Sequence, residues 1–188
     1  YTERAGQPRP MDVEWALDGE TGQLYVVQAR PETVQSRRQK GVLESYSLLE
    51  HSKVLVQGRS IGEGIAAGEV QKIESASQIQ AFEDGNILVT DTTDPDWEPI
   101  MKRASAIVTN RGGRTSHAAI VSRELGLPAI VGTGDATRQL EDGQSVTVSC
   151  AEGETGNLYE GILEFDVEII EIDSSIELDT DIMVNLAD

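Results

Sequence analysis

The chain is short of several residue types, and each shortage limits what the protein can be. Among 188 residues there is one cysteine, Cys150, so neither an internal disulfide nor a cysteine-built metal cluster can form. No window approaches the roughly 18 to 20 unbroken apolar residues of a membrane span, and the first residues do not resemble a signal peptide. These absences predict a cytoplasmic protein with no membrane partner.

Basic residues and aromatic residues are also scarce. Lys and Arg number 15 against 33 Asp and Glu, which gives a net charge of -18, and residues 163–188 carry acidic but no basic side chains. An acidic surface repels the phosphates of nucleic acids, so we exclude a nucleic-acid partner. Aromatics make up 4% of the chain, so its core has to be built from aliphatic side chains. The composition predicts an α/β protein.

The sequence predicts four segments of different character. The first, residues 1–35, contains two strands at 12–17 and 24–29 joined by a glycine-bearing turn, a hairpin that should belong to a larger sheet because isolated hairpins are marginally stable. Residues 36–52 are polar and are expected to be a linker, helical around Leu43–Leu49. Residues 53–165 are expected to form one compact domain, and residues 166–188 a connector followed by a strand at 182–184.

The compact domain should alternate strands and short helices. Buried strands are expected near 54–56, 87–89, 106–109, 129–131, 145–150 and 162–165, and helices near 76–83 and 95–104. Asp94 followed by Pro95 is typical of a helix N-cap and first turn. Glu98 and Lys102 have the spacing of a supporting ion pair on the outer face of that helix.

Residues 106–131 predict a strand, a glycine turn, a helix and a second strand. Thr115 is expected as the N-cap of the helix, and Gly126 stands where a helix C-terminus favours glycine. The turn and the first helical turn contain an unusual concentration of functional groups: Arg111, Gly112, Gly113, Arg114, Thr115, Ser116 and His117.

That concentration suits phosphoryl chemistry. A helix N-terminus offers unpaired N–H groups and a positive dipole end, both favourable for an anion. His117 could act as a covalent nucleophile, with Arg111 or Arg114 holding the phosphate and the two glycines leaving space for a donor or acceptor. The residues alone leave two readings open, because a Gly-Gly pair can be a tight turn and a first-turn histidine can be a cap or a surface residue.

The run from Thr109 to Ala129 resembles the phosphohistidine signature of the PEP-utilizing enzymes, a family that includes phosphoenolpyruvate synthases, pyruvate phosphate dikinases and enzyme I of the sugar phosphotransferase system. The resemblance implies a swivelling β/β/α phosphohistidine domain in which His117 is phosphorylated. Gly112, Gly113, Arg111, Arg114, Thr115 and Ser116 would then support the phosphate. It further implies that Thr115 is phosphorylated by a regulatory kinase, and that the full-length enzyme is a homodimer. Ser116 departs from the cysteine common in synthases.

Both flanks resemble parts of the same family. Residues 12–15 and 27–33 resemble the end of an ATP-grasp nucleotide-binding domain, which implies that Glu14 helps hold Mg²⁺ with the nucleotide and that Gln28 and Arg30 face the ATP phosphates. Taken alone, such charges are common on a hairpin surface. Residues 180–188 resemble the first strand of a pyruvate-binding TIM barrel. This domain order, and residues 90–99, favour the synthase branch.

The resemblance implies that the parent enzyme converts ATP, pyruvate and water to phosphoenolpyruvate, AMP and phosphate. The carrier would move between the ATP-grasp and TIM-barrel domains of the same enzyme, and this fragment alone would be inactive. Two alternatives stay open: the carrier domain of a dikinase, and a stand-alone carrier module without catalysis. A metal-dependent hydrolase is disfavoured because the sequence has no cluster of histidines and carboxylates.

Overall fold

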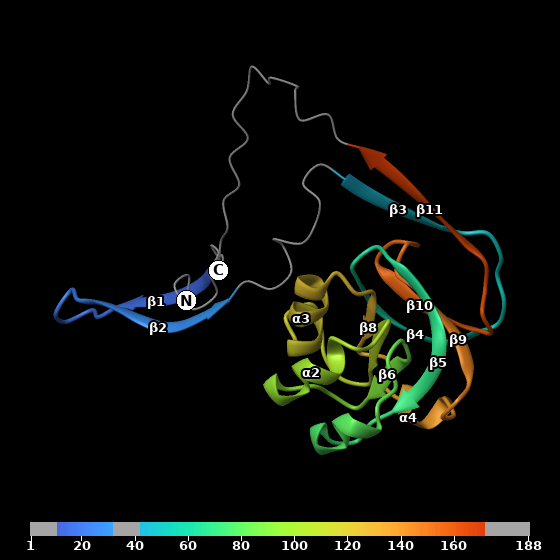
Figure 1. The fold of residues 1–188 in the computed structure, drawn as a ribbon, viewed down its shortest axis with the longest axis horizontal. Coiled ribbons are helices and arrows are strands. Elements are labelled where there is room, and N and C mark those ends of the chain that lie inside the picture. Colours follow the sequence, from blue (N-terminus) through green and yellow to red (C-terminus); the bar gives the residue numbers. More distant parts are fainter. Residues whose placement is uncertain (1–10, 32–41, 172–188) are drawn as a thin grey trace.

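The computed structural model describes residues 11–31 and 42–171, which form a sheet-dominated mixed α/β structure (Figure 1). Its strands make a two-stranded hairpin, a two-stranded arm and a closed seven-stranded barrel. The strand expected at 182–184 lies outside the described residues. In the described part of the chain, no helix is long and apolar enough to cross a membrane.

The hairpin pairs β1 (Met11–Leu17) with β2 (Leu24–Pro31), so the expected strands and turn are confirmed. Asp18 organises the turn, because its carboxylate accepts hydrogen bonds from the backbone N–H groups of Glu20 at 2.8 Å and Thr21 at 2.9 Å. The hydrogen bond from Thr21 is the main cause that lowers the pKa of Asp18. Apolar side chains such as Trp15 and Val26 are exposed, 64% and 65%, as expected of strands that pack elsewhere in a larger sheet.

The arm pairs β3 (Val42–Leu48) with β11 (Phe165–Glu171) in antiparallel register. The helix expected around Leu43–Leu49 is therefore wrong. The strand expected near 162–165 and the connector expected after it are also wrong, because one strand begins at Phe165 and continues to Glu171. The two segments are far apart in sequence, and the pairing, with Tyr46 and Phe165 rings 6.4 Å apart, outweighs local preference.

The barrel has the strand order β10-β4-β8-β7-β6-β5-β9 and closes between β9 and β10. β5 pairs with β6, β6 with β7 and β7 with β8, all in parallel. At the two ends of this group, β5 pairs with β9 and β8 pairs with β4, both antiparallel. The barrel strands are β4 (Val54–Ile61), β5 (Ile65–Lys72), β6 (Ile87–Thr90), β7 (Ala106–Thr109), β8 (Ala129–Val131), β9 (Ser145–Ser149) and β10 (Thr155–Glu160).

The three central strands β6, β7 and β8 are buried on both faces. Ile87 and Val89 pack into the barrel interior with Val108 and Ile130, whereas Leu88 and Ile107 pack against the helices on the other face. Side chains of a strand alternate between faces, so continuous apolar strands serve two cores at once. Many of the aliphatic side chains of the protein are buried in these three strands.

Short helical segments cover one side of the barrel, where Figure 1 shows α2 and α3 next to each other. Asp94 caps the segment after β6 by accepting a hydrogen bond from Asp96 N at 2.9 Å, and Lys102 Nζ lies 2.6 Å from Glu98 Oε1, so both expectations are confirmed. The segments on this side are η2 (Ala76–Ala81), η3 (Pro95–Trp97), α2 (Glu98–Met101) and α3 (His117–Leu125), whereas α4 (Ala136–Gln139) packs with the barrel interior through Ala136.

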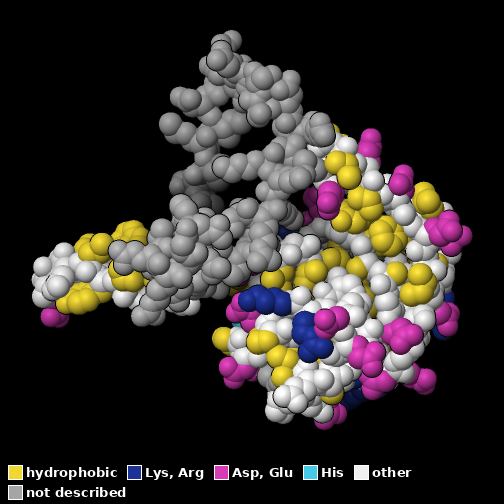
Figure 2. Space-filling view, in the orientation of Figure 1, with side chains coloured by type: hydrophobic (Ala, Val, Ile, Leu, Met, Phe, Trp, Pro, Cys, Tyr) yellow, Lys and Arg dark blue, Asp and Glu magenta, His cyan; other side chains and the backbone are white. Residues whose placement is uncertain are grey.

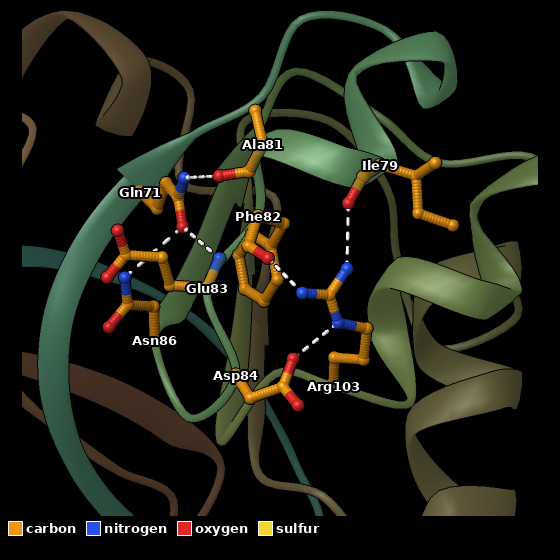
Figure 3. Close-up of polar contacts among 8 residues, drawn as sticks. All are labelled: Gln71, Ile79, Ala81, Phe82, Glu83, Asp84, Asn86 and Arg103. Atoms are coloured by element: carbon orange, nitrogen blue, oxygen red, sulfur yellow. Dashed lines mark hydrogen bonds and ion pairs between the residues drawn. The ribbon is translucent and has the colours of Figure 1, made fainter.

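Arg103, just after α2, holds the segment that follows η2 (Figure 3). Its guanidinium donates to the carbonyls of Ile79, at 2.8 Å, and Phe82, forms an ion pair with Asp84, and lies 5.9 Å from the centre of the Phe82 ring. Gln71 on β5 binds the same segment through hydrogen bonds with Ala81, Glu83 and Asn86. One forked donor thus fixes this segment, because it binds the Phe82 carbonyl and adds a hydrogen bond to the Ile79 carbonyl, which also accepts from Phe82 N at 3.3 Å.

Replacing Arg103 tests this role. Arg103→Met should lower the free energy of unfolding by about 1–2 kcal/mol, because the Phe82 carbonyl loses its donor and the Ile79 carbonyl loses one of two. Urea denaturation followed by circular dichroism measures the change. Arg138→Met, at an exposed position on α4, is the control and should change it by less than about 0.5 kcal/mol. Equal losses in the two variants would contradict the assignment.

Candidate functional site

Three loops meet at one edge of the barrel, because the carboxyl ends of parallel strands lie together. They follow β6, β7 and β8 and begin at Asp91, Asn110 and Gly132. Backbone hydrogen bonds join them: Arg111 N donates to Asp91 O at 2.9 Å, and Gly134 N donates to Asn110 O at 2.9 Å. The turn expected to carry the chemistry, residues 110–116, is the middle loop and is held from both sides.

Asn110 is the main side-chain link among these loops. Its amide nitrogen donates to Thr137 Oγ1 at 2.7 Å and to Asp91 Oδ1 at 3.2 Å, and its amide oxygen accepts from Thr137 N at 3.1 Å. A side chain with both donors and an acceptor engaged has a defined orientation. The start of the turn is therefore fixed before the helix begins.

His117 is the first residue of α3 and is half-buried. Its Nδ1 lies 3.0 Å from Oγ1 of Thr93, a side chain that is only 8% exposed in the loop after β6. Either atom can be the donor, depending on the tautomer. Among the described residues, no hydrogen bond engages Nε2, so this nitrogen is the one available to a substrate.

The N-cap of α3 is Ser116, and the expectation of Thr115 as the cap is wrong. Ser116 Oγ accepts from Ala119 N at 3.4 Å and donates to the Gly113 carbonyl at 2.8 Å. The serine thus links the helix to the turn, and the helix begins one residue later than expected. Gly126 ends it in a left-handed conformation with φ 70°, as predicted.

The two glycines of the turn differ in what the fold requires. Gly112 has φ 124°, and a Cβ there would lie 2.9 Å from Ser116 Oγ. Its carbonyl in turn fits against Gly132, where a Cβ would lie only 2.8 Å from that oxygen. Gly113 has open space around it and no left-handed φ, so the fold would accept a side chain there. Gly113 leaves clearance on the outer side of the turn.

Both arginines of the turn are ion-paired with carboxylates. Arg111 contacts Asp91 and thereby holds the pKa of that carboxyl below its ordinary value. Arg114 contacts Glu154, in the loop between β9 and β10, and Arg59 Nη1 lies 3.1 Å from the same Glu154 oxygen. On the face shown in Figure 2, acidic side chains are spread widely and basic ones stand in small groups.

The three residues expected to contact nucleotide lie on the hairpin. Glu14 on β1 is directly opposite Gln28 on β2, and both are exposed, while Arg30 pairs in register with Asp12. The side chain of Arg30 lies outside the described part. Within residues 11–31 and 42–171, no group of three His, Cys, Asp or Glu side chains could hold a metal ion. Glu14 can supply a carboxylate oxygen, the ligand that Mg²⁺ prefers, but only as one ligand of a larger set.

Sequence reasoning missed several residues of this site. Thr93 had a signal, since it stands in a polar run directly after a buried strand whose end the topology brings to His117. Asp91 had the same signal. Glu154 had none, because it is 40 positions from Arg114 and only barrel closure brings the two together.

Two family models match the chain. Residues 82–153 match the PEP-utilising enzyme, mobile domain, and residues 3–48 match the pyruvate phosphate dikinase, AMP/ATP-binding domain. The first range contains the three loops and α3. The second contains the hairpin.

Curated relatives carry the name phosphoenolpyruvate synthase. Those of Pseudomonas aeruginosa and Escherichia coli are 60% and 57% identical over 178 residues, which cover 95% of this chain and 22% of each relative. That of Synechocystis is 52% identical over 186 residues, 99% of this chain and 23% of the relative. A solution structure of an Enzyme I protein overlaps 42% of this chain and 33% of its own, with 33% identity and a TM-score of 0.36.

The chain spans about a fifth of the length of the curated relatives it matches. Residues 82–153 are therefore similar to the mobile domain of the PEP-utilising enzymes, and nearly the whole chain is similar to proteins named phosphoenolpyruvate synthase.

Proposed function

We propose that this chain contains the phosphoryl carrier of a phosphoenolpyruvate synthase and that His117 is the residue phosphorylated. The contact between His117 Nδ1 and Thr93 carries the proposal, because it occupies one ring nitrogen and leaves the other free at the rim of the barrel. A neutral imidazole with its proton on Nδ1, donated to Thr93 Oγ1, has its lone pair on Nε2. That tautomer is the nucleophile.

The transfer involves one bond formed and one broken at each stage. The Nε2 lone pair forms a bond to the β-phosphorus of ATP, the bond from that phosphorus to the AMP oxygen breaks with its electrons on AMP, and the γ-phosphate is lost to water. The enolate oxygen of pyruvate then takes the phosphoryl group, and the electrons of the broken P–N bond return to Nε2. The sum is ATP, pyruvate and water to AMP, phosphoenolpyruvate and phosphate.

The surroundings of His117 support a charged intermediate. The N–H groups of the first helical turn favour an anion, and the guanidinium groups of Arg111 and Arg114 have the geometry for phosphate. Thr93 Oγ1 accepts a hydrogen bond from Nδ1–H while the ring becomes positively charged. Clearance at Gly113 lets a donor or acceptor approach the turn. The roles of Gly112 and Ser116 are to set the shape of the turn.

The neighbouring domains belong to the same proposal. We assign the hairpin to the end of an ATP-grasp domain and the C-terminal residues to the start of a TIM barrel, with the carrier moving between them in the cytoplasm. Glu14, Gln28 and Arg30 would contribute to the nucleotide site. Mg²⁺ bound there with ATP would offset the charge of its phosphates. The alternative, the carrier domain of a pyruvate phosphate dikinase, differs only in the acceptor of the γ-phosphate, which would be inorganic phosphate rather than water.

Thr115 carries a second proposal, a regulatory phosphorylation site. Its side chain is exposed, and it lies two residues before His117. A phosphate on Thr115 would add about two negative charges at pH 7 and would repel a phosphoryl donor from the turn. A kinase could reach this hydroxyl because it has no part in capping α3.

The full-length enzyme with ATP labelled at the β-phosphate tests the carrier directly. We expect an acid-labile, alkali-stable phosphoprotein that His117→Asn abolishes, because the amide cannot form the phosphorus–nitrogen bond. Label that persists in His117→Asn would overturn the proposal. Release of the γ-phosphate with water alone indicates a synthase, and a requirement for inorganic phosphate indicates a dikinase.

Replacing Thr93 tests the role of the hydroxyl. Thr93→Val keeps the shape and removes the partner of Nδ1, so the rate of His117 phosphorylation should fall about tenfold, the effect of one lost hydrogen bond of roughly 1.4 kcal/mol. Thr93→Ser restores the hydroxyl and should recover most of the rate. Rapid-quench measurement of the phosphoprotein gives the rates. If valine and serine reduce the rate equally, the hydroxyl has no role.

A further inference from the structure

Glu154 is shared by two arginines. Its Oε2 contacts the guanidinium of Arg114 in the His117 turn and lies 3.1 Å from Arg59 Nη1 on β4. The three side chains come from separate parts of the barrel, and the carboxylate stands between the two cations. One negative charge therefore neutralises only part of a local positive charge.

We propose that Glu154 is a positioning residue that holds Arg114 at the side of the turn while His117 is unphosphorylated and releases it to the phosphoryl group when the carrier is loaded. The inference rests on the proposed function of His117. It assigns Glu154 a competing role, because the carboxylate and the phosphoryl group are alternative partners of the same guanidinium.

Only the side chain of Arg114 has to move. Its backbone carbonyl accepts a hydrogen bond from Arg123 Nη1 on α3 at 2.8 Å. The adjoining backbone is held by the hydrogen bond from Ser116 N to the Gly113 carbonyl at 3.0 Å. Arg114, Arg123 and Glu154 all border an open groove of about 470 Å³, so the guanidinium has space in which to turn.

The exposure of the pair makes the exchange inexpensive. The side chains of Arg114 and Glu154 are 52% and 70% exposed, and ion pairs between such groups contribute little to stability. A phosphoryl group offers more charge and a bidentate geometry to the guanidinium. After the exchange Glu154 keeps Arg59 as a partner, so no charge is left uncompensated.

Asp91, the partner of Arg111, is less suited to such an exchange. Its side chain also accepts a hydrogen bond from Asn110 at 3.2 Å, and its carbonyl accepts from Arg111 N at 2.9 Å. Asp91 is thus part of the connection between two loops. Arg114 is the arginine whose partner can be replaced without disturbing the turn.

The experiment measures the equilibrium fraction of phosphohistidine in the full-length enzyme at fixed concentrations of ATP, AMP and phosphate. Glu154→Gln removes the competitor, so the ratio of phosphorylated to free His117 should rise about 1.5- to fivefold, the range that an exposed ion pair contributes. The gain should shrink as salt is raised. Glu160→Gln removes the same charge from an exposed position on β10 and should leave the ratio unchanged.

The Arg114→Met background separates competition from a structural effect. If Glu154 acts through Arg114, adding Glu154→Gln to Arg114→Met should change nothing. Phosphohistidine that forms normally but is insensitive to Glu154→Gln, or a gain that persists without Arg114, overturns this inference and leaves the carrier function standing. Absence of phosphohistidine at His117 in the unmodified enzyme overturns both.

Discussion

The parallel pairing of β6, β7 and β8 is the constraint on which the site depends. Because the three strands run in the same direction, the loops that follow them emerge at one edge of the barrel. The loops that begin at residues 91, 110 and 132 therefore come together there. The strands are buried on both faces, so their register cannot slip without exposing an apolar core. His117 and Thr93, 24 positions apart, inherit their 3.0 Å contact from this register.

Local sequence signals predicted the elements that depend on neighbours in the chain. The cap at Asp94, the glycine end of α3 at Gly126 and the hairpin turn at Asp18 all follow from side chains close to the backbone groups they bind. The concentration of polar groups before α3 pointed to His117, which the structure places at the start of α3 beside Thr93. In each case the determining contact spans only a few residues.

Long-range pairing decided what the sequence could not show. The segment around Leu43–Leu49 was expected to be partly helical, but Val42–Leu48 forms a strand because Phe165–Glu171 supplies a partner. The N-cap of α3 is Ser116 rather than the expected Thr115, because the turn brings the Gly113 carbonyl to the serine hydroxyl. Glu154 joined the site only through closure of the barrel, which no local pattern encodes.

The proposed function requires an acidic protein to bear a phosphoryl group, and local electrostatics would make this possible. The net charge of -18 opposes an anion at long range, whereas the helix start and two arginines favour it locally. Carboxylates pair with both arginines, but Glu154 is shared with Arg59, so part of the positive charge beside the turn is not neutralised. In our proposal, Glu154 is a weakly held counter-ion of Arg114 that a phosphoryl group can displace.

The central claim is that His117 carries phosphorus on Nε2 while Nδ1 keeps its proton. NMR of the full-length enzyme, with ¹⁵N in its histidine rings, shows which ring nitrogen of His117 carries the proton and which carries phosphorus, before and after addition of ATP. The account predicts a protonated Nδ1 in the free enzyme and coupling of ³¹P to Nε2 of His117 after loading. Phosphorus bonded to Nδ1, or to any residue other than His117, would contradict it.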